Sequence, residues 1–144
     1  DRATNVDISS AYISAAQSVA EKLGLRERVD YRIADFAREG DAVPTADVVI
    51  LHRVVCCYPD MPHLVTAAAQ HANRLLALTF PREAWYMRLF EKLGNFGLWL
   101  TRSSFRFYMH SPEAILAVAA ESGLQPVQQK FSWPWQIVVF ERST

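Results

Sequence analysis

Apolar residues recur along the chain with two alternating periods. Short β-branched or alternating runs predict strands at residues 4–8, 29–34 and 47–51, and the last of these (DVVIL) has the continuous apolar pattern of a strand buried on both faces. Apolar residues at spacings of three and four predict helices at residues 11–23 and 63–73. Strand and helix therefore alternate, which is typical of βαβ units with a parallel sheet.

The pattern changes in the second half of the chain, after a further buried strand predicted at residues 75–80. Within residues 83–100, the large apolar side chains would fall on all faces of a helix instead of forming one stripe. Gly94 and Gly97 are expected to interrupt that helix. A serine-proline pair at residues 111–112 predicts the start of one more helix.

The last thirty residues contain two β-rich runs. Residues 126–133 and 135–141 are separated only by Pro134, so they can pair only as antiparallel neighbours. The whole pattern predicts an α/β fold: one doubly wound, mostly parallel sheet, helices on both faces and a C-terminal antiparallel hairpin. We expect the strands ending near Asp7, Asp35, Leu51 and Phe80 to share that sheet.

Length and charge narrow the class of protein. With 144 residues, half of them apolar, the chain has material for one core, so residues 1–144 are predicted to form a single domain. Fifteen basic and fifteen acidic residues give a net charge of zero, which does not favour binding to nucleic acid or an anionic membrane. The charge is more compatible with a small-molecule substrate. No apolar run is long enough to cross a bilayer, and the adjacent Cys56 and Cys57 make no metal cage. We expect a cytoplasmic enzyme without a metal site.

Five segments in a fixed order carry a family resemblance. ATNVDISS, RVDYRIADF, ADVVILHRVVCCYPD, RLLALTFPR and SGLQPVQQKFSWPWQIVVFER together resemble the second strand onward of a class I (Rossmann-like) S-adenosylmethionine-dependent methyltransferase. The resemblance covers essentially the whole chain. It implies a sheet with S-adenosylmethionine across the carboxyl ends of its strands. It also implies that the first strand and its glycine-rich turn are missing, so we expect weak cofactor binding and self-association of the incomplete chain.

The resemblance assigns the adenosine half of the cofactor site to two strand ends. Asp7, beside Ile8, would accept both ribose hydroxyls, and Asp35, beside Phe36, would accept from the adenine amino group. The alternatives are local: Asp7 caps the following helix together with its serines, and Asp35 is an ordinary turn residue.

The same resemblance places the reacting groups after the third of these strands. His52 would lie beside the cofactor and could act as a general base, and Arg53 would face the substrate. A histidine at a strand end is also commonly a structural residue. Methyl transfer needs no base where positioning and exclusion of water suffice.

An aromatic segment supplies the remaining substrate candidates. Trp85, Tyr86, Arg106 and Tyr108 could line a pocket for a flat or greasy acceptor. Packing against the sheet, or an interfacial helix on a membrane, would use the same residues. The predicted function is methyl transfer from S-adenosylmethionine to a small molecule by direct displacement. The alternatives are a non-catalytic relic or partner subunit, and a nicotinamide-dependent oxidoreductase.

Overall fold

The computed structural model describes residues 2–83, 85–103 and 105–143. The chain divides into two compact units, Asp1–Pro44 and Thr45–Thr144, and each is described here by itself. The single domain expected over residues 1–144 stays a prediction.

The first unit is a parallel strand pair with a helical connection. Its elements are β1 (Ala3–Asp7), α1 (Ser10–Lys22), a 3₁₀ turn (Arg26–Arg28), β2 (Val29–Ile33), α2 (Phe36–Glu39) and a second 3₁₀ turn (Gly40–Ala42). Ser9 begins α1 because its side chain accepts a hydrogen bond from the Tyr12 amide, and Gly24, with φ +67°, follows its C-terminal end. Sequence patterns predicted both strands and α1 within two residues but missed the four-residue α2.

The second unit contains the remaining strands and the longer helices. Its elements are β3 (Ala46–His52), the 3₁₀ helix η3 (Val55–Cys57), α3 (Met61–His71), β4 (Ala72–Pro81), α4 (Trp85–Leu100), α5 (Pro112–Glu121), β5 (Leu124–Ser132) and β6 (Trp135–Arg142). Asp60 and Ser111 cap α3 and α5 through their side chains, and each helix has a proline in its first turn.

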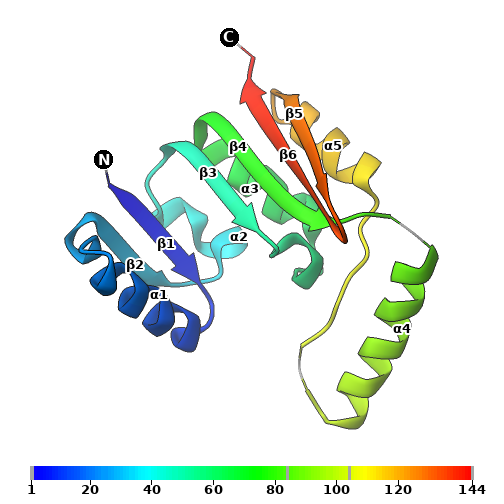
Figure 1. Cartoon of the computed structure of the whole chain (residues 1–144). Coiled ribbons are helices and arrows are strands. Elements are labelled where there is room, and N and C mark those ends of the chain that lie inside the picture. The colour runs from blue at the N-terminus through cyan, green and yellow to red at the C-terminus, as the bar shows by residue number, and fades with distance from the viewer. Residues whose placement is uncertain (1, 84, 104, 144) are drawn as a thin grey trace. The chain divides into compact units, whose positions relative to one another are not determined.

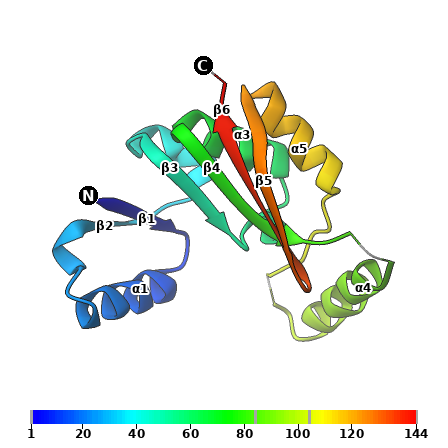
Figure 2. The ribbon, with the colours of Figure 1, turned by 45° about the horizontal axis from the view of Figure 1, so that its top comes forward.

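Four strands of the second unit form one sheet in the order β3-β4-β6-β5. β3 and β4 are parallel, whereas β6 is antiparallel to both β4 and β5, so the expected C-terminal hairpin is confirmed. α3 and α5 lie together on one face of this sheet (Figures 1 and 2). The buried side chains of β4 alternate, with Leu76, Leu78 and Phe80 all at most 1% exposed.

The expectation that all four predicted parallel strands share one sheet is wrong. β1 and β2 form a separate two-stranded sheet. In the part of the chain that the structure describes, β1 pairs only with β2. β3 is an edge strand there, and its one partner is β4. Membership of a sheet depends on partners that are distant in the sequence, and local periodicity does not specify these partners. Each parallel pair therefore forms without the other.

The prediction that glycines interrupt the helix after β4 is also wrong. α4 runs continuously through Gly94 and Gly97. Each glycine costs a helix about 1 kcal/mol, and the leucines and charged residues around them are good helix formers. α4 extends away from the sheet, beyond the end at which β4 finishes (Figure 1).

Two polar side chains on one side of α4 hold the extended segment that follows it. The Asn95 amide group donates to the Phe107 carbonyl and accepts from the Phe107 amide, both at 2.8 Å. One turn earlier, the Glu91 carboxylate accepts from the Met109 amide at 3.2 Å. None of the described helices is long and apolar enough to cross a membrane.

Arg142, at the end of β6, joins three elements of the second unit. Its guanidinium donates to the carbonyls of Ala69 and Ala72, where α3 passes into β4, with an Nε to oxygen distance of 3.0 Å at Ala72. A longer bond of 3.4 Å reaches the Ser122 carbonyl after α5. The Ala69 carbonyl also accepts from the amide of Ala72, the C-cap residue of α3, so Arg142 adds a second donor there.

Candidate functional site

Asp7 is the last residue of β1 and turns the chain into α1. One carboxylate oxygen, Oδ1, accepts from the Ser9 amide at 2.7 Å, which stabilises the turn. Among the described residues no contact to the second oxygen, Oδ2, is seen. Asp7 therefore supports the turn, Ser9 alone caps α1, and Asp7 keeps an acceptor for another donor. Ile8, the next residue, is 72% exposed.

Asp35 lies two residues beyond the end of β2, at the same edge of this strand pair as Asp7. Its Oδ1 accepts from the Ala37 amide at 3.2 Å, and Oδ2 lies 3.7 Å from Nε of Arg38. Asp35 is therefore the N-cap of α2, and its own amide donates to the Glu39 carboxylate. Phe36 begins that helix and is half-buried. The four predicted adenosine contacts thus lie together at the carboxyl edge of β1 and β2.

His52 ends β3 opposite Thr79 of β4, with its side chain exposed. Arg53 follows in a left-handed conformation with φ +60°, and its amide donates to the Thr79 carbonyl. Its guanidinium lies 4.7 Å from the centre of the Trp135 ring, a cation–π contact. Arg53 is thereby held on the sheet beside β6, at the strand ends where parallel sheets bind ligands.

The segment after α4 returns to the end of β3. The Tyr108 amide donates to the Cys56 carbonyl of η3 at 2.8 Å. Two residues later a ring nitrogen of His110, Nε2, lies 3.0 Å from the Tyr58 carbonyl oxygen. The Tyr108 and His110 rings stack with centroids 6.1 Å apart. Tyr108 therefore lies close to the loop that carries His52 and Arg53.

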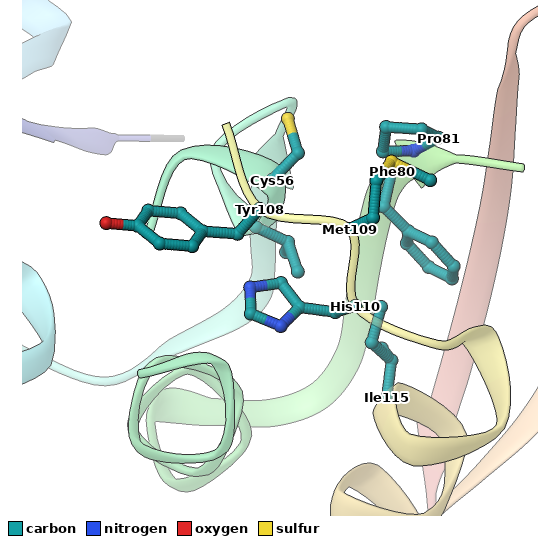
Figure 3. Close-up of a pocket in the computed structure, with 8 residues that line it drawn as sticks. Cys56, Phe80, Pro81, Tyr108, Met109, His110 and Ile115 are labelled. Atoms are coloured by element: carbon teal, nitrogen blue, oxygen red, sulfur yellow. The ribbon is translucent and has the colours of Figure 1, made fainter. Parts of the chain in front are cut away.

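A small depression lies beside this segment (Figure 3). It contains about 160 Å³ of space between atoms, including space open to solvent. Pockets that enclose drug-sized ligands have about 300–1,000 Å³. Figure 3 shows Met109 beside Phe80 and Pro81, so side chains fill most of this region. The depression is too small for an acceptor molecule.

Of the other predicted substrate residues, the structure describes only the side chain of Arg106, and it does not line the depression. Arg106 folds back on its own segment and donates to the carbonyls of Ser103 and Phe105 at 2.6 and 2.7 Å. Trp85 and Tyr86 begin α4, and their side chains lie outside the part of the chain that the structure describes.

Sequence reasoning missed His110 and Met109. Both lie in the extended segment directly before Ser111, the cap of α5. The sequence predicts the cap. It does not predict that this segment returns to η3, because the contact joins residues about fifty positions apart.

No family model matches the chain, and no curated protein matches it in sequence. Solved structures do match it. Magnesium protoporphyrin IX methyltransferase from Synechocystis PCC 6803, with bound S-adenosylhomocysteine, is 22% identical, with a TM-score of 0.76 over 97% of this chain and 64% of that chain.

Two further structures are similar in the same way. An O-methyltransferase family protein from Burkholderia thailandensis is 17% identical, with a TM-score of 0.78 over 99% of this chain and 44% of that one. An O-methyltransferase family 2 protein from Planctomyces limnophilus, in complex with apigenin, is 20% identical, with a TM-score of 0.75 over 99% and 43%. The chain thus spans between 43% and 64% of the lengths of these three proteins. At these identities the similarity establishes the fold, and this chain has the fold of the class I S-adenosylmethionine-dependent methyltransferases.

Proposed function

We propose that this chain belongs to an enzyme that transfers a methyl group from S-adenosylmethionine to a small-molecule acceptor. The observation that carries the proposal is the carboxyl edge of the parallel strands β1 and β2, where Asp7 ends β1 and Asp35 lies two residues beyond β2. Ligands of open α/β sheets bind outside this edge. The names of the similar structures support the same reaction, and they make an oxygen acceptor the first to test.

The local geometry separates the roles of the two aspartates. Asp7 uses one carboxylate oxygen in its turn, so the second can accept from ribose hydroxyls. Both oxygens of Asp35 already contact the first turn of α2, which leaves it a weaker acceptor for the adenine amino group. Ile8 and Phe36 provide apolar surface beside these carboxylates.

The chain's contribution to the reaction is binding and orientation. S-adenosylmethionine supplies the methyl group on a sulfonium, which is already a strong electrophile. His52 is exposed at the end of β3, where its imidazole can accept a proton from an acceptor hydroxyl. Arg53 precedes η3 and Tyr108 is hydrogen-bonded to its Cys56 carbonyl, so both can orient the acceptor.

Titration calorimetry with S-adenosylhomocysteine tests the proposal on the full chain. Asp7→Asn should weaken binding by about 1.5–3 kcal/mol, because it removes a charged acceptor of two donors. Asp35→Asn should cost about 0.5–1.5 kcal/mol, the range of an ordinary hydrogen bond.

Asp30→Asn is the matched control, because Asp30 lies on β2 and its carboxylate pairs with Arg32 of the same strand. It should bind like the parent chain. Parental affinity in both the Asp7 and the Asp35 variants would mean that neither carboxylate touches the cofactor.

A further inference from the structure

Two thiols meet in the short helix after β3. Cys56 and Cys57 are the only cysteines of the chain, and both belong to η3. Their Sγ atoms lie 3.7 Å apart, within hydrogen-bonding distance. Both Sγ atoms also lie close to the carbonyl oxygen of Arg53, at 3.5 Å for Cys56 and 3.7 Å for Cys57. The two sulfurs therefore converge on one side of the turn.

This separation does not suit a disulfide. Adjacent Cα atoms are about 3.8 Å apart across a trans peptide, below the usual disulfide range of about 4.4–6.8 Å. The sulfurs would also have to approach to about 2.05 Å. A bound ion needs no such approach. With bonds of about 2.3 Å, two ligand sulfurs lie about 3.8 Å apart on a tetrahedral metal ion and roughly 3.5 Å apart on pyramidal trivalent arsenic, whose angle is about 100°. The observed separation matches a chelate.

The two thiols also differ in reactivity. Cys56 is 3% exposed, whereas Cys57 is half-buried and reachable from solvent. The hydrogen bond from Cys56 lowers the pKa of Cys57 to about 7, against the opposing effect of burial. The same hydrogen bond, together with burial, raises the pKa of Cys56. Near neutral pH a substantial share of Cys57 is therefore thiolate, beside a thiol at Cys56.

We propose that Cys56 and Cys57 form a two-sulfur binding site for a thiophilic metalloid or soft metal ion that brings its remaining ligands with it. No group of three or more His, Cys, Asp or Glu side chains able to hold a metal occurs among the described residues, so the protein supplies only two donors here. A trivalent organoarsenical has the matching valence, because it carries one carbon substituent and exchanges two oxygen bonds for two sulfur bonds. This proposal does not depend on the methyltransferase function.

The binding reaction is balanced without an oxidant. With phenylarsine oxide, the Cys57 thiolate attacks arsenic and forms the first arsenic–sulfur bond. The Cys56 thiol forms the second bond as its proton passes to the departing oxygen. The arsenic–oxygen bond is lost, and the oxygen leaves as water with one proton from Cys56 and one from the solvent, which received the Cys57 proton when the thiolate formed. Arsenic stays trivalent, and neither sulfur is oxidised.

Phenylarsine oxide is therefore the probe for the test, with intact-protein mass and the count of remaining free thiols as readouts. The parent chain should bind one equivalent and lose both free thiols. A dithiol, 2,3-dimercaptopropanol, should release the probe, whereas the same concentration of glutathione should not. Cys57→Ser should hold the probe at least about a hundredfold more weakly, because the second bond is no longer intramolecular.

Gln128→Cys/Gln129→Cys, introduced into a chain in which both native cysteines are serine, is the matched control. These exposed neighbours lie on β5, where adjacent side chains point to opposite faces of the sheet. The control should bind as weakly as Cys57→Ser. Far-UV circular dichroism establishes that each variant is folded. The proposal fails if the parent takes up two equivalents, if Cys57→Ser retains parental affinity, or if the β5 pair binds as tightly as η3.

Discussion

Arg53 determines the surroundings of the thiols at the scale of single residues. Its left-handed backbone, with φ +60°, is uncommon for a residue with a long side chain. The Thr79 carbonyl and the Trp135 ring hold the two ends of the residue, and its carbonyl oxygen lies close to both sulfurs. The hydrogen bond between the two thiols is the main cause of their different pKa values.

Removing the donor tests that cause. In Cys56→Ala, the pKa of Cys57 should rise from about 7 toward its ordinary value of 9.0, because the thiolate loses its hydrogen bond. The rate of carbamidomethylation of Cys57, measured by mass spectrometry from pH 5.5 to 10, gives the midpoint for each chain. Coincident midpoints in the parent and the variant would contradict the assigned cause.

The lowered pKa of Cys57 also makes the stability of the fold depend on pH. Folding lowers the pKa of Cys57, so its contribution is present above pH 9 and is lost as the pH falls toward 7. Cys56 acts in the opposite sense: its pKa is raised, so its contribution is present below pH 9 and is lost at higher pH.

The two aspartates show which properties of the candidate site the sequence could predict. Asp7 and Asp35 were identified because each ends or follows a β-rich run, and each has a local role that differs from the alternative considered: Asp7 supports the turn before Ser9, which caps α1, and Asp35 caps α2. The sequence could not tell which carboxylate keeps a second acceptor. That property depends on short contacts such as the one with Arg38.

At the scale of elements, β3 and β4 were the most predictable. The run of β4 reflects burial, whereas the expectation that residues 47–51 are buried on both faces is wrong: Leu51 is buried, but Val48 and Ile50 are 48% and 65% exposed. A continuous apolar run predicts a strand, but its burial depends on neighbours that are distant in the sequence. α2 and α4 were less predictable for opposite reasons. α2 is too short to show a period, and the glycines of α4 lower its propensity without ending it.

The α4 glycines can be replaced without a clash. No atom lies within 4 Å of a Cβ added at Gly94 or Gly97, and neither has a positive φ. Gly94→Ala should therefore stabilise the helix by about 1 kcal/mol, which corresponds to roughly fivefold slower amide exchange in α4. Hydrogen exchange resolved by residue measures the effect.

Gly24→Ala is the control for this prediction. Its added Cβ would also have no atom within 4 Å, but its φ of +67° disfavours any residue with a Cβ. Exchange at the end of α1 should become faster. Slower exchange in both variants would mean that backbone conformation does not decide the outcome.

Arg142 provides a prediction about how elements are tied together. Arg142→Met keeps much of the side-chain length but removes the donors to the Ala69 and Ala72 carbonyls, two residues that are fully buried. The loss should cost about 2–4 kcal/mol of unfolding free energy. Urea unfolding followed by tryptophan emission measures it, and all four tryptophans lie beyond residue 84.

Arg74→Met is the comparison for this variant, because Arg74 is exposed on the neighbouring strand β4. Its effect should stay within about 0.5 kcal/mol. Equal losses in the two variants would assign the effect to charge instead of to the hydrogen bonds.

At the scale of the whole molecule, the order of elements was predictable and the pairing of the strands was not. Alternation of strand and helix follows from local periodicity, whereas membership of a sheet depends on partners far away in the sequence. The result is an edge on β3 whose sequence, ADVVILH, is mostly apolar. Ile50 of this strand is 65% exposed. The other edge of the same sheet, β5, has Pro126, a register shift and several polar residues, which protect against further pairing.

We therefore expect self-association through β3. Ile50→Lys should keep the chain monomeric at concentrations where the parent associates, because a charge on an edge strand opposes pairing. Val127→Lys on β5, where the native side chain is 56% exposed, should behave like the parent. Sedimentation velocity across a concentration series measures both. Monomeric parent chain throughout the series would show that the open edge does not drive association.

The two contacts between α4 and the segment behind it have a geometric consequence. Four helical residues advance about 6 Å and two extended residues about 6.6 Å, so Glu91 and Asn95 match Met109 and Phe107 in pitch. Each such step also rotates the helix face by about 40°, which carries the next position, Trp99, out of line. The series therefore ends after the two contacts, at Glu91 and Asn95. Breaking one of them leaves the segment attached to α4 at a single point, about which it can pivot.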